Sequence, residues 1–181
     1  MYNFLEHFKT ITEHKLLVAR GCFAVGLYYQ GIVHDLSKYS PDEFLVGARY
    51  FQGDQSPNNA ERDDKGYSSA WLHHKGRNKH HYEYWMDYNA KKVEGEVLLP
   101  APMPDKYIVE MFMDRIAACK VYQGKDYTQE APLRYYRQGR PELLMHEKTR
   151  ALLEKLLVML SERGEDETCR YIRREVLKNR R

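Results

Sequence analysis

The stretch GIVHDLSKYS, residues 31–40, decides the fold because it places a histidine beside an aspartate between two helical patterns. A helix is predicted over residues 22–36, and it carries the pair His34-Asp35 near its end. The glycines of this helix would each weaken it by roughly 1 kcal/mol relative to alanine unless they allow close packing. The pair is therefore expected where a helix ends, with both side chains available to a site.

The residues that follow predict two further helices and a loop. Ser40 is expected to be an N-cap, with Pro41 at the first helical position and Glu43 as the reciprocal capping-box partner. Residues 52–66 are polar and rich in turn residues, so a surface loop is predicted there. Ser68 or Ser69 then caps a short helix that ends at the Gly-Arg-Asn of residues 76–78.

Helical periodicity covers most of the remaining chain. Helices are predicted over residues 4–18, 80–89 and 105–122, over a last segment from Pro141 to Gly164 with Leu144, Leu152, Leu156 and Leu160 facing inward, and over the tail 168–181. No stretch alternates at period two over a useful length, so no major sheet is expected. The expected fold class is all-α, with one domain over residues 1–181, a motif-bearing core at about 7–122 and C-terminal helices at about 141–181.

The composition excludes several classes of protein. The chain has 29 Lys and Arg against 26 Asp and Glu, which argues against a polybasic nucleic-acid binder. Aromatic residues make up 13% of it, too many for a disordered chain. No apolar run approaches the ~18 residues that cross a bilayer, and the N-terminus lacks signal-peptide order. The widely spaced Cys22, Cys119 and Cys169 form no disulfide framework, so a cytoplasmic location is expected.

Histidines and acidic residues lie on the predicted inward faces. His14 shares a helical stripe with Ile11 and Val18, and Asp114 lies between Met111 and Ala118 on another inward face. The segment AWLHHKGRNKHHYEYW, residues 70–85, adds four more histidines. For His14 the alternative is a core histidine bonded to a carbonyl group, and for Asp114 it is an ion pair with Arg115 or a neighbouring lysine.

Carboxylates buried in a helical core are costly without a partner, and a metal ion would remove that cost. Imidazole and carboxylate ligands without cysteine suit Mn, Fe, Ni, Co, Zn or Mg rather than a structural zinc site. The sequence therefore predicts one or two divalent ions, whose identity it does not specify.

The order of these residues resembles that of the HD-domain superfamily, which comprises all-helical, metal-dependent phosphohydrolases. The resemblance is carried by His14, by His34-Asp35 within HDLSK, by residues 70–85 and by Asp114, and it covers about residues 7–122. The segment 70–85 is similar to that of a small bacterial and phage branch without an assigned reaction. The resemblance implies an HD-type helical bundle.

The resemblance also implies a set of metal ligands. The first ion would be held by His14, His34, Asp35 and Asp114. In members with two metals Asp35 bridges the ions and two more histidines contribute; His74 and His81 are chosen here, with His73 and His80 as substitutes. These extra histidines are closer in sequence than in many two-metal members.

The implied activity is hydrolysis of a small phosphate ester or nucleotide by metal-bound hydroxide. Asp35, Lys38 and Glu110 are the expected catalytic residues: Lys38 would contact a phosphate oxygen, and Glu110 would orient a ligand histidine or accept a proton. Lys75, Arg77 and Lys79 are further candidates for binding an anion.

Two alternatives remain open at this point. Some HD-type proteins hold two irons and activate O₂, and others bind a metal or nucleotide without turnover. The expected partner is a small phosphorylated molecule or nucleotide, without a membrane or nucleic acid, and a homo-oligomer is possible. Residues 52–66 and the crossover 91–104 are expected to shape the mouth of the pocket.

Overall fold

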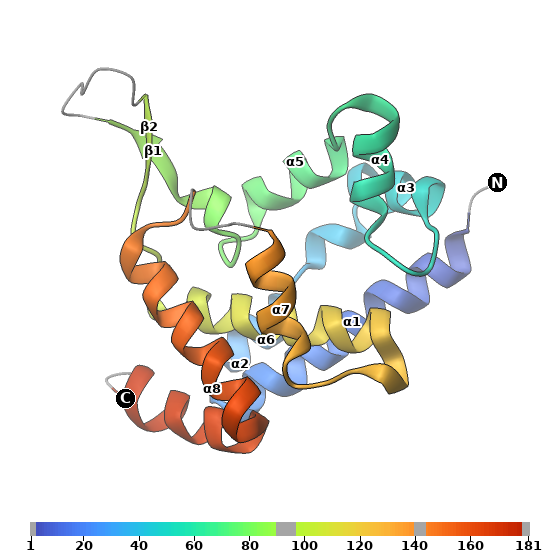
Figure 1. The fold of residues 1–181 in the computed structure, drawn as a ribbon. Helices are drawn as coiled ribbons and strands as arrows, with labels where there is room; N and C mark the ends of the chain where they lie inside the picture. The colour runs from blue at the N-terminus through green and yellow to red at the C-terminus, as the bar shows by residue number, and fades with distance from the viewer. Residues whose placement is uncertain (1–2, 90–96, 140–143, 179–181) are drawn as a thin grey trace.

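Helices α1 (Phe4–Ala24) and α6 (Asp105–Gln123) pack side by side at the centre of the molecule (Figure 1). This arrangement is seen in a computed structural model, which describes residues 3–89, 97–139 and 144–178. The buried residues of α1 recur every three or four positions, as the sequence predicts for an inward stripe. They are His7, Ile11, His14, Val18 and Cys22.

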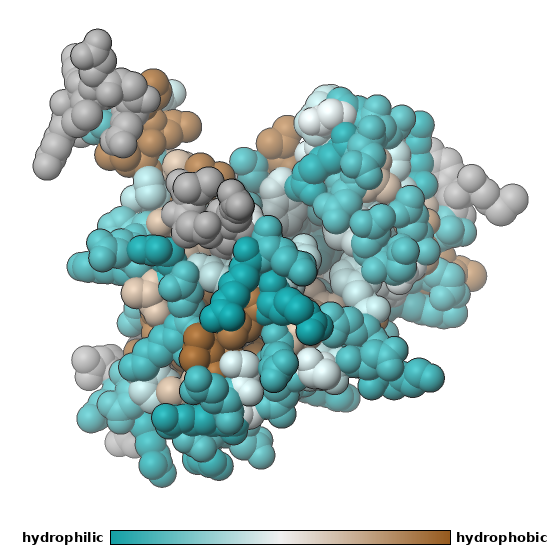
Figure 2. Space-filling model, viewed as in Figure 1, coloured by the Kyte–Doolittle hydropathy of each residue, from teal (hydrophilic) through white to brown (hydrophobic). Residues whose placement is uncertain are grey.

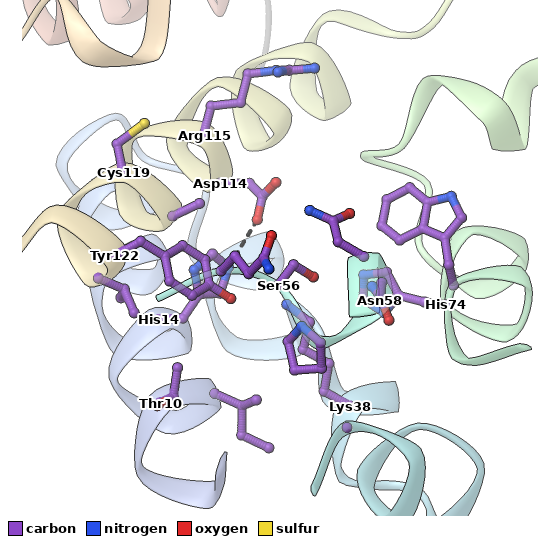
Figure 3. A pocket seen from close by; sticks show the side chains of 18 of the residues that line it. Thr10, His14, Lys38, Ser56, Asn58, His74, Asp114, Arg115, Cys119 and Tyr122 are labelled. Atoms are coloured by element: carbon purple, nitrogen blue, oxygen red, sulfur yellow. Dashed lines mark hydrogen bonds and ion pairs between the residues drawn. The ribbon is translucent and has the colours of Figure 1, made fainter. Parts of the chain in front are cut away.

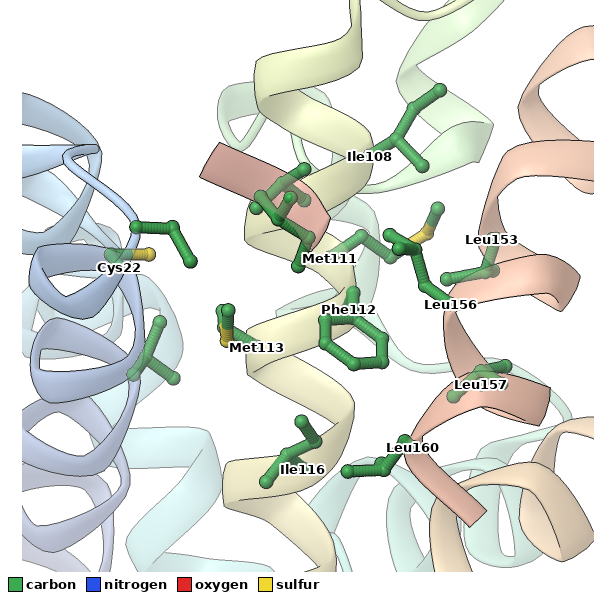
Figure 4. Packing of buried hydrophobic residues seen from close by; sticks show 14 of the residues in the cluster. Cys22, Ile108, Met111, Phe112, Met113, Ile116, Leu153, Leu156, Leu157 and Leu160 are labelled. Atoms are coloured by element: carbon green, nitrogen blue, oxygen red, sulfur yellow. The ribbon is translucent and has the colours of Figure 1, made fainter. Parts of the chain in front are cut away.

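Helix α6 is buried along much of its length because it also packs against α8 (Glu147–Tyr171). Figure 4 shows Phe112 and Ile116 of α6 beside Leu157 and Leu160 of α8, and all four side chains are buried. Each such side chain stabilises the fold by roughly 1.5–3 kcal/mol. This apolar contact fixes the helix on which Asp114 lies.

The chain between residues 22 and 39 differs from the predicted single helix. Helix α1 continues to Ala24, and Gly26 then adopts a left-handed conformation with φ +84°, which a residue with a side chain rarely adopts. A short helix α2 (Tyr28–Val33) and a 3₁₀ turn η1 (Leu36–Tyr39) follow. Gly31 does allow close packing, because a Cβ atom there would lie 2.7 Å from the ring of Phe23.

The predicted start of helix α3 (Pro41–Tyr50) is confirmed, but its capping box is wrong. The hydroxyl of Ser40 makes no cap hydrogen bond. Glu43 is buried, and its carboxylate binds two histidines instead of the helix terminus. The hydrogen bonds of Glu43 with these two histidines thus replace the local capping interaction.

The predicted loop over residues 52–66 contains a helix, α4 (Pro57–Lys65), which ends at the left-handed Gly66. The reason is tertiary: the buried carboxylate of Glu61 accepts hydrogen bonds from the hydroxyls of Ser68 and Ser69. Helix α5 (Ser69–Arg77) starts as predicted, because Ser68 accepts a hydrogen bond from the Trp71 amide at 3.0 Å.

The helix predicted over residues 80–89 is wrong. A 3₁₀ turn η2 (Tyr82–Trp85) leads into strand β1 (Met86–Tyr88), which pairs antiparallel with β2 (Leu98–Pro100). The indole of Trp85 donates to the Lys79 carbonyl, which holds the turn before the strand. In the described chain this hairpin is the only sheet, so the expectation of no major sheet is confirmed.

The hairpin extends away from the helices in Figure 1, and its apolar side chains are exposed in Figure 2. Most of the remaining visible face in Figure 2 is hydrophilic. Within the described residues, no helix combines the length and the apolar character that a bilayer span requires.

The C-terminal part departs from the prediction at its start. A turn η3 (Gly124–Asp126) and a helix missed by sequence, α7 (Ala131–Gln138), precede α8. Pro141 lies outside the described residues, and Leu144 is exposed because α8 begins only at Glu147. Leu152 is half-buried, whereas Leu156 and Leu160 are buried as predicted.

Gly164 interrupts α8 with φ +83° but does not end the helical segment. The chain remains helical to Tyr171 and continues through a π-helical turn, η5 (Ile172–Val176). The predicted helical tail is thus confirmed up to residue 176, and its last residues, 179–181, lie outside the described chain. The all-α fold class is confirmed.

Candidate metal centre

Asp35 occupies the centre of the site in an unusual backbone conformation. Its φ is +53°, and it is the one non-glycine residue with positive φ among those described. Aspartate tolerates this left-handed conformation better than most residues, although at a cost. The conformation follows directly after α2, and both His34 and Asp35 are 1% exposed. The chain thus turns two adjacent polar side chains into the interior.

One oxygen of Asp35 faces a first group of candidate ligands. Its Oδ2 lies 3.3 Å from Nε2 of His34 and 3.8 Å from Nε2 of His14. Oδ1 of Asp114 lies 2.9 Å from Nε2 of His14 and 3.5 Å from Nε2 of His34, and Figure 3 marks the contact with His14. The candidate ligand atoms of these four residues lie within 4.8 Å of one another.

The other oxygen of Asp35 faces a second group. Its Oδ1 lies 3.3 Å from Nε2 of His74 and 3.3 Å from Nε2 of His80. His81 completes this group, again with ligand atoms within 4.8 Å of one another. Asp35 therefore stands between two clusters, in the position of a bridging carboxylate.

Several atoms in these clusters are buried without a hydrogen-bond partner. They are Nε2 of His34, His80 and His81 and Oδ1 of Asp35, whereas Oδ2 of Asp35 lies 2.7 Å from the ammonium of Lys38. An unsatisfied buried polar group costs about 1–3 kcal/mol, so a native structure rarely gathers so many. Divalent ions bound in the two groups would satisfy these atoms, and imidazole nitrogens together with carboxylate oxygens suit such ions.

Two buried glutamates hold the rings from behind. Oε1 of Glu110 lies 2.9 Å from Nδ1 of His34 and 3.1 Å from Nδ1 of His80. Oε2 of Glu43 lies 2.7 Å from Nδ1 of His74. Because an ionised carboxylate only accepts hydrogen bonds, Nδ1 of each ring carries a proton, and Nε2 is the nitrogen that faces Asp35. This is how outer carboxylates prepare histidines for a metal.

Charges within the site shift its pKa values. Burial opposes charge on Asp35, but His34 and Lys38 outweigh burial and hold the pKa of this carboxyl well below its usual range. Burial likewise opposes protonation of His34, yet Asp35 and Asp114 raise its pKa well above the usual value. A metal ion on His34 must therefore displace a proton.

Lys38 lies in the 3₁₀ turn η1, whereas the sequence predicts it one turn after His34 on the same helix, because α2 ends before the left-handed Asp35. Its Nζ is 2.7 Å from Oδ2 of Asp35, and it lines the cavity beside the two groups. Burial opposes its charge, but Asp35 and Asp114 raise the pKa of this ammonium above its usual range. Lys38 is therefore a fixed positive charge at the centre.

All six predicted ligands come together in these two groups. The sequence assigned His80 only as a substitute, whereas the structure places it in the second group. His73, the other substitute, lies outside: its Nδ1 is 2.6 Å from Glu43 and its Nε2 is 3.3 Å from Asp42. The sequence signal that could have identified His80 as a ligand is the helix break at residues 76–78. After such a break His80 and His81 need not follow helical geometry, so both can face the second group. Glu43 was missed, since its spacing matched a capping box.

A cavity of about 620 Å³ adjoins the centre. Residues 54–59 line it, so part of the segment 52–66, which is expected to shape its mouth, does contribute to the cavity. The described residues of the crossover, 97–104, do not line it. Lys75, Arg77 and Lys79 also lie outside its lining, and Arg115 of α6 is a lining cation that was not predicted to bind a ligand.

Fold and site together define a helical protein with a buried histidine–carboxylate centre suited to divalent ions. Residues 3–159 match the family of unknown function DUF5662, and the chain belongs to that family. No match is found among curated proteins or among solved structures.

Proposed function

We propose that this protein is a metal-dependent phosphohydrolase of the HD type, acting on a small phosphate ester or nucleotide in the cytoplasm. The observation that carries the proposal is the position of Asp35 between two ligand groups, with one carboxylate oxygen toward each. Such a centre would hold two ions close together, an arrangement that suits in-line displacement at phosphorus.

His14, His34, Asp35 and Asp114 would hold one ion, and Asp35, His74, His80 and His81 the other. Bound there, divalent ions would lower the pKa of water toward neutrality and polarise the phosphoryl group. The other contributions to the proposed reaction would come from side chains of the protein.

Glu110 and Glu43 keep the ring nitrogens of the ligands oriented, so the centre needs little rearrangement when it is loaded. Glu110 acts from behind the ligands, with its carboxylate held by two rings. Of the two roles considered for Glu110, this contact supports orientation of a ligand rather than acceptance of a proton.

Lys38 supplies a permanent positive charge at the edge of the cavity, where it would neutralise charge developing on phosphoryl oxygens. The cavity has the size of typical small-molecule sites, which supports a small substrate rather than a polymer.

The test starts with metal analysis of protein purified without a chelator, combined with anomalous scattering to place the ions. The same preparation is assayed on a panel of phosphate monoesters and nucleotides with added Mn²⁺, Fe²⁺, Co²⁺, Ni²⁺, Zn²⁺ or Mg²⁺. Release of phosphate that is lost in Asp35→Asn supports the proposal.

Three results would redirect or reject it. Two irons with a visible absorption band and oxidation of an alcohol or C–H bond would assign the centre to oxygen chemistry. Bound ions without turnover on the whole panel would indicate a binding module. Absence of metal at His34, Asp35 and Asp114 would overturn the assignment of the site.

A further inference from the structure

The cavity contains a cation that the proposed chemistry does not use. Arg115 follows Asp114 on α6 and lines the cavity. Its guanidinium lies over the ring of Tyr136, 5.5 Å from the ring centre, and its Nε is buried without a hydrogen-bond partner. Among the described residues no carboxylate forms a salt bridge with Arg115, although Glu83, on which its charge acts, also lines the cavity.

Among the described residues that line the cavity, Lys38 is the one lysine and Arg115 is the one arginine. The two side chains lie in different parts of the cavity. Lys38 is held at 2.7 Å by Asp35, at the centre itself. Adjacent residues on a helix point about 100° apart, so Arg115 diverges from the Asp114 carboxylate. Figure 3 shows its side chain directed away from His14 and Lys38, along the cavity wall.

A guanidinium is a planar fork of donors that matches carboxylate and phosphate groups, and stacking on an aromatic ring fixes its plane. The ring of Tyr136 provides that support, and this side chain is itself buried. The amides of Asn58 and Asn59 line the same cavity and can donate to the same kind of anion.

We propose that Arg115 binds a second anionic group of the substrate, separate from the phosphoryl group at the metal centre. The inference rests on the proposed function and narrows its substrate to phosphate esters that also carry a carboxylate or a second phosphate. Arg115 is thus a specificity-determining residue, with its side chain directed away from His14 and Lys38 (Figure 3).

The test compares matched ligands that differ by one anionic group. Phenyl phosphate is compared with 4-carboxyphenyl phosphate, and fructose 6-phosphate with fructose 1,6-bisphosphate, each by kcat and KM on the metal-loaded protein. Binding of phenylphosphonate and 4-phosphonobenzoate, which are not hydrolysed, is measured by calorimetry with and without Mn²⁺. The two substrate pairs distinguish a carboxylate from a second phosphate.

We expect the wild-type protein to favour the ligand with the second anion by roughly tenfold or more, the usual scale for a charge-assisted pair. Arg115→Met removes this preference, mainly through KM, while metal content and thermal unfolding stay close to the wild type. Arg163→Met, which removes an exposed arginine of α8 paired with Glu167, keeps the preference.

The outcomes separate this inference from the proposed function. Hydrolysis without any preference for the second anion overturns the role of Arg115 and leaves the phosphohydrolase in place. A preference in binding that depends on Arg115, without hydrolysis of any phosphate ester, supports the anion site and rejects the phosphohydrolase. Equal binding of both phosphonates, or binding of neither, overturns the anion site.

Discussion

Oε2 of Glu43 lies 2.7 Å from Nδ1 of His74, although 31 residues separate the two in sequence. The other oxygen of the same carboxylate lies 2.6 Å from Nδ1 of His73. Glu43 therefore connects α3 to α5 through two hydrogen bonds, and it directs Nε2 of His74 toward Asp35. A residue that sequence alone assigns to a helix cap thus becomes a determinant of the second ligand group.

Replacing Glu43 by glutamine should selectively lower the metal affinity of the second group. The amide is a poorer acceptor for Nδ1–H of His74, and loss of such a carboxylate typically lowers metal affinity 10–100-fold. We expect the Mn²⁺ stoichiometry of Glu43→Gln, measured at graded free metal, to fall from two to one before the first site empties. Asp42→Asn is the control, because Asp42 is exposed and its carboxylate lies 3.3 Å from His73, which is outside both ligand groups. Identical titration of Glu43→Gln and wild type would contradict this role.

Asp35→Asn should abolish metal binding in both groups while preserving the backbone conformation of residue 35. Asparagine also tolerates the left-handed conformation that residue 35 adopts, so the variant removes charge without adding strain. Without the shared carboxylate neither group keeps its ligand set, and both metal content and phosphate release should fall to background. Asp87→Asn, on the exposed hairpin, should retain both. A metal-loaded Asp35→Asn protein would show that the groups do not depend on a bridging residue.

Metal binding should raise the melting temperature. An ion that binds only the folded chain stabilises it by about 2.7 kcal/mol at a hundred times its Kd. For a chain of this length that corresponds to roughly 5–10 °C in Tm. Thermal unfolding with and without Mn²⁺, and after addition of a chelator, measures the effect. The increase should be absent in Asp35→Asn; an equal increase there would mean that the ions bind elsewhere.

Gly47 should be intolerant of a side chain, whereas Gly76 should accept one. A Cβ atom at Gly47 would collide with the imidazole of His7, and such overpacking typically costs about 1–3 kcal/mol. Gly76 is also helical but has no neighbouring atom within 4 Å of a Cβ, so Gly76→Ala should stabilise by about 0.5–1 kcal/mol. Urea unfolding of both variants measures the difference, and equal effects would refute the packing argument.

His7 should make stability depend on acidity. Burial, together with the charge of Lys38, lowers the pKa of His7 to about 4. The unfolded chain takes up this proton near pH 6.5 and the folded chain only near pH 4, so stability is full above pH 6.5 and falls as the pH drops through this range. Between pH 7 and pH 4.5 the loss is about 2 kcal/mol. In urea unfolding, the free energy of unfolding of His7→Gln should fall between these pH values by about 2 kcal/mol less than that of the wild type. If the two proteins show parallel pH profiles, His7 is excluded as the cause.

The parts of the site that sequence predicts well lie on long helices. His14 and Asp114 were assigned because each falls on an apolar stripe with spacing of three and four, and α1 and α6 keep that periodicity. A helix of many turns leaves little freedom in which face is buried. The direction of a side chain on such a helix is therefore readable from its neighbours in sequence.

The parts that sequence predicts poorly lie where tertiary contacts decide the backbone. The left-handed conformations of Gly26 and Asp35 break a segment whose pattern favours one helix. His80 and His81 precede a 3₁₀ turn and a strand, so the rule that adjacent helical residues point apart does not apply to them. Helix α4 depends on the buried Glu61, whose partners come from the next helix.

The contact of His14 with Asp114 joins positions 100 residues apart. Closing so long a loop is entropically expensive and is repaid only by contacts made when the loop is closed. The ligand set is therefore complete only after α6 has emerged from the ribosome and docked on α1. A nascent or proteolysed chain ending before residue 114 carries most of the histidines but lacks the full first group. Loading of the proposed metal centre would therefore report completed folding of the chain.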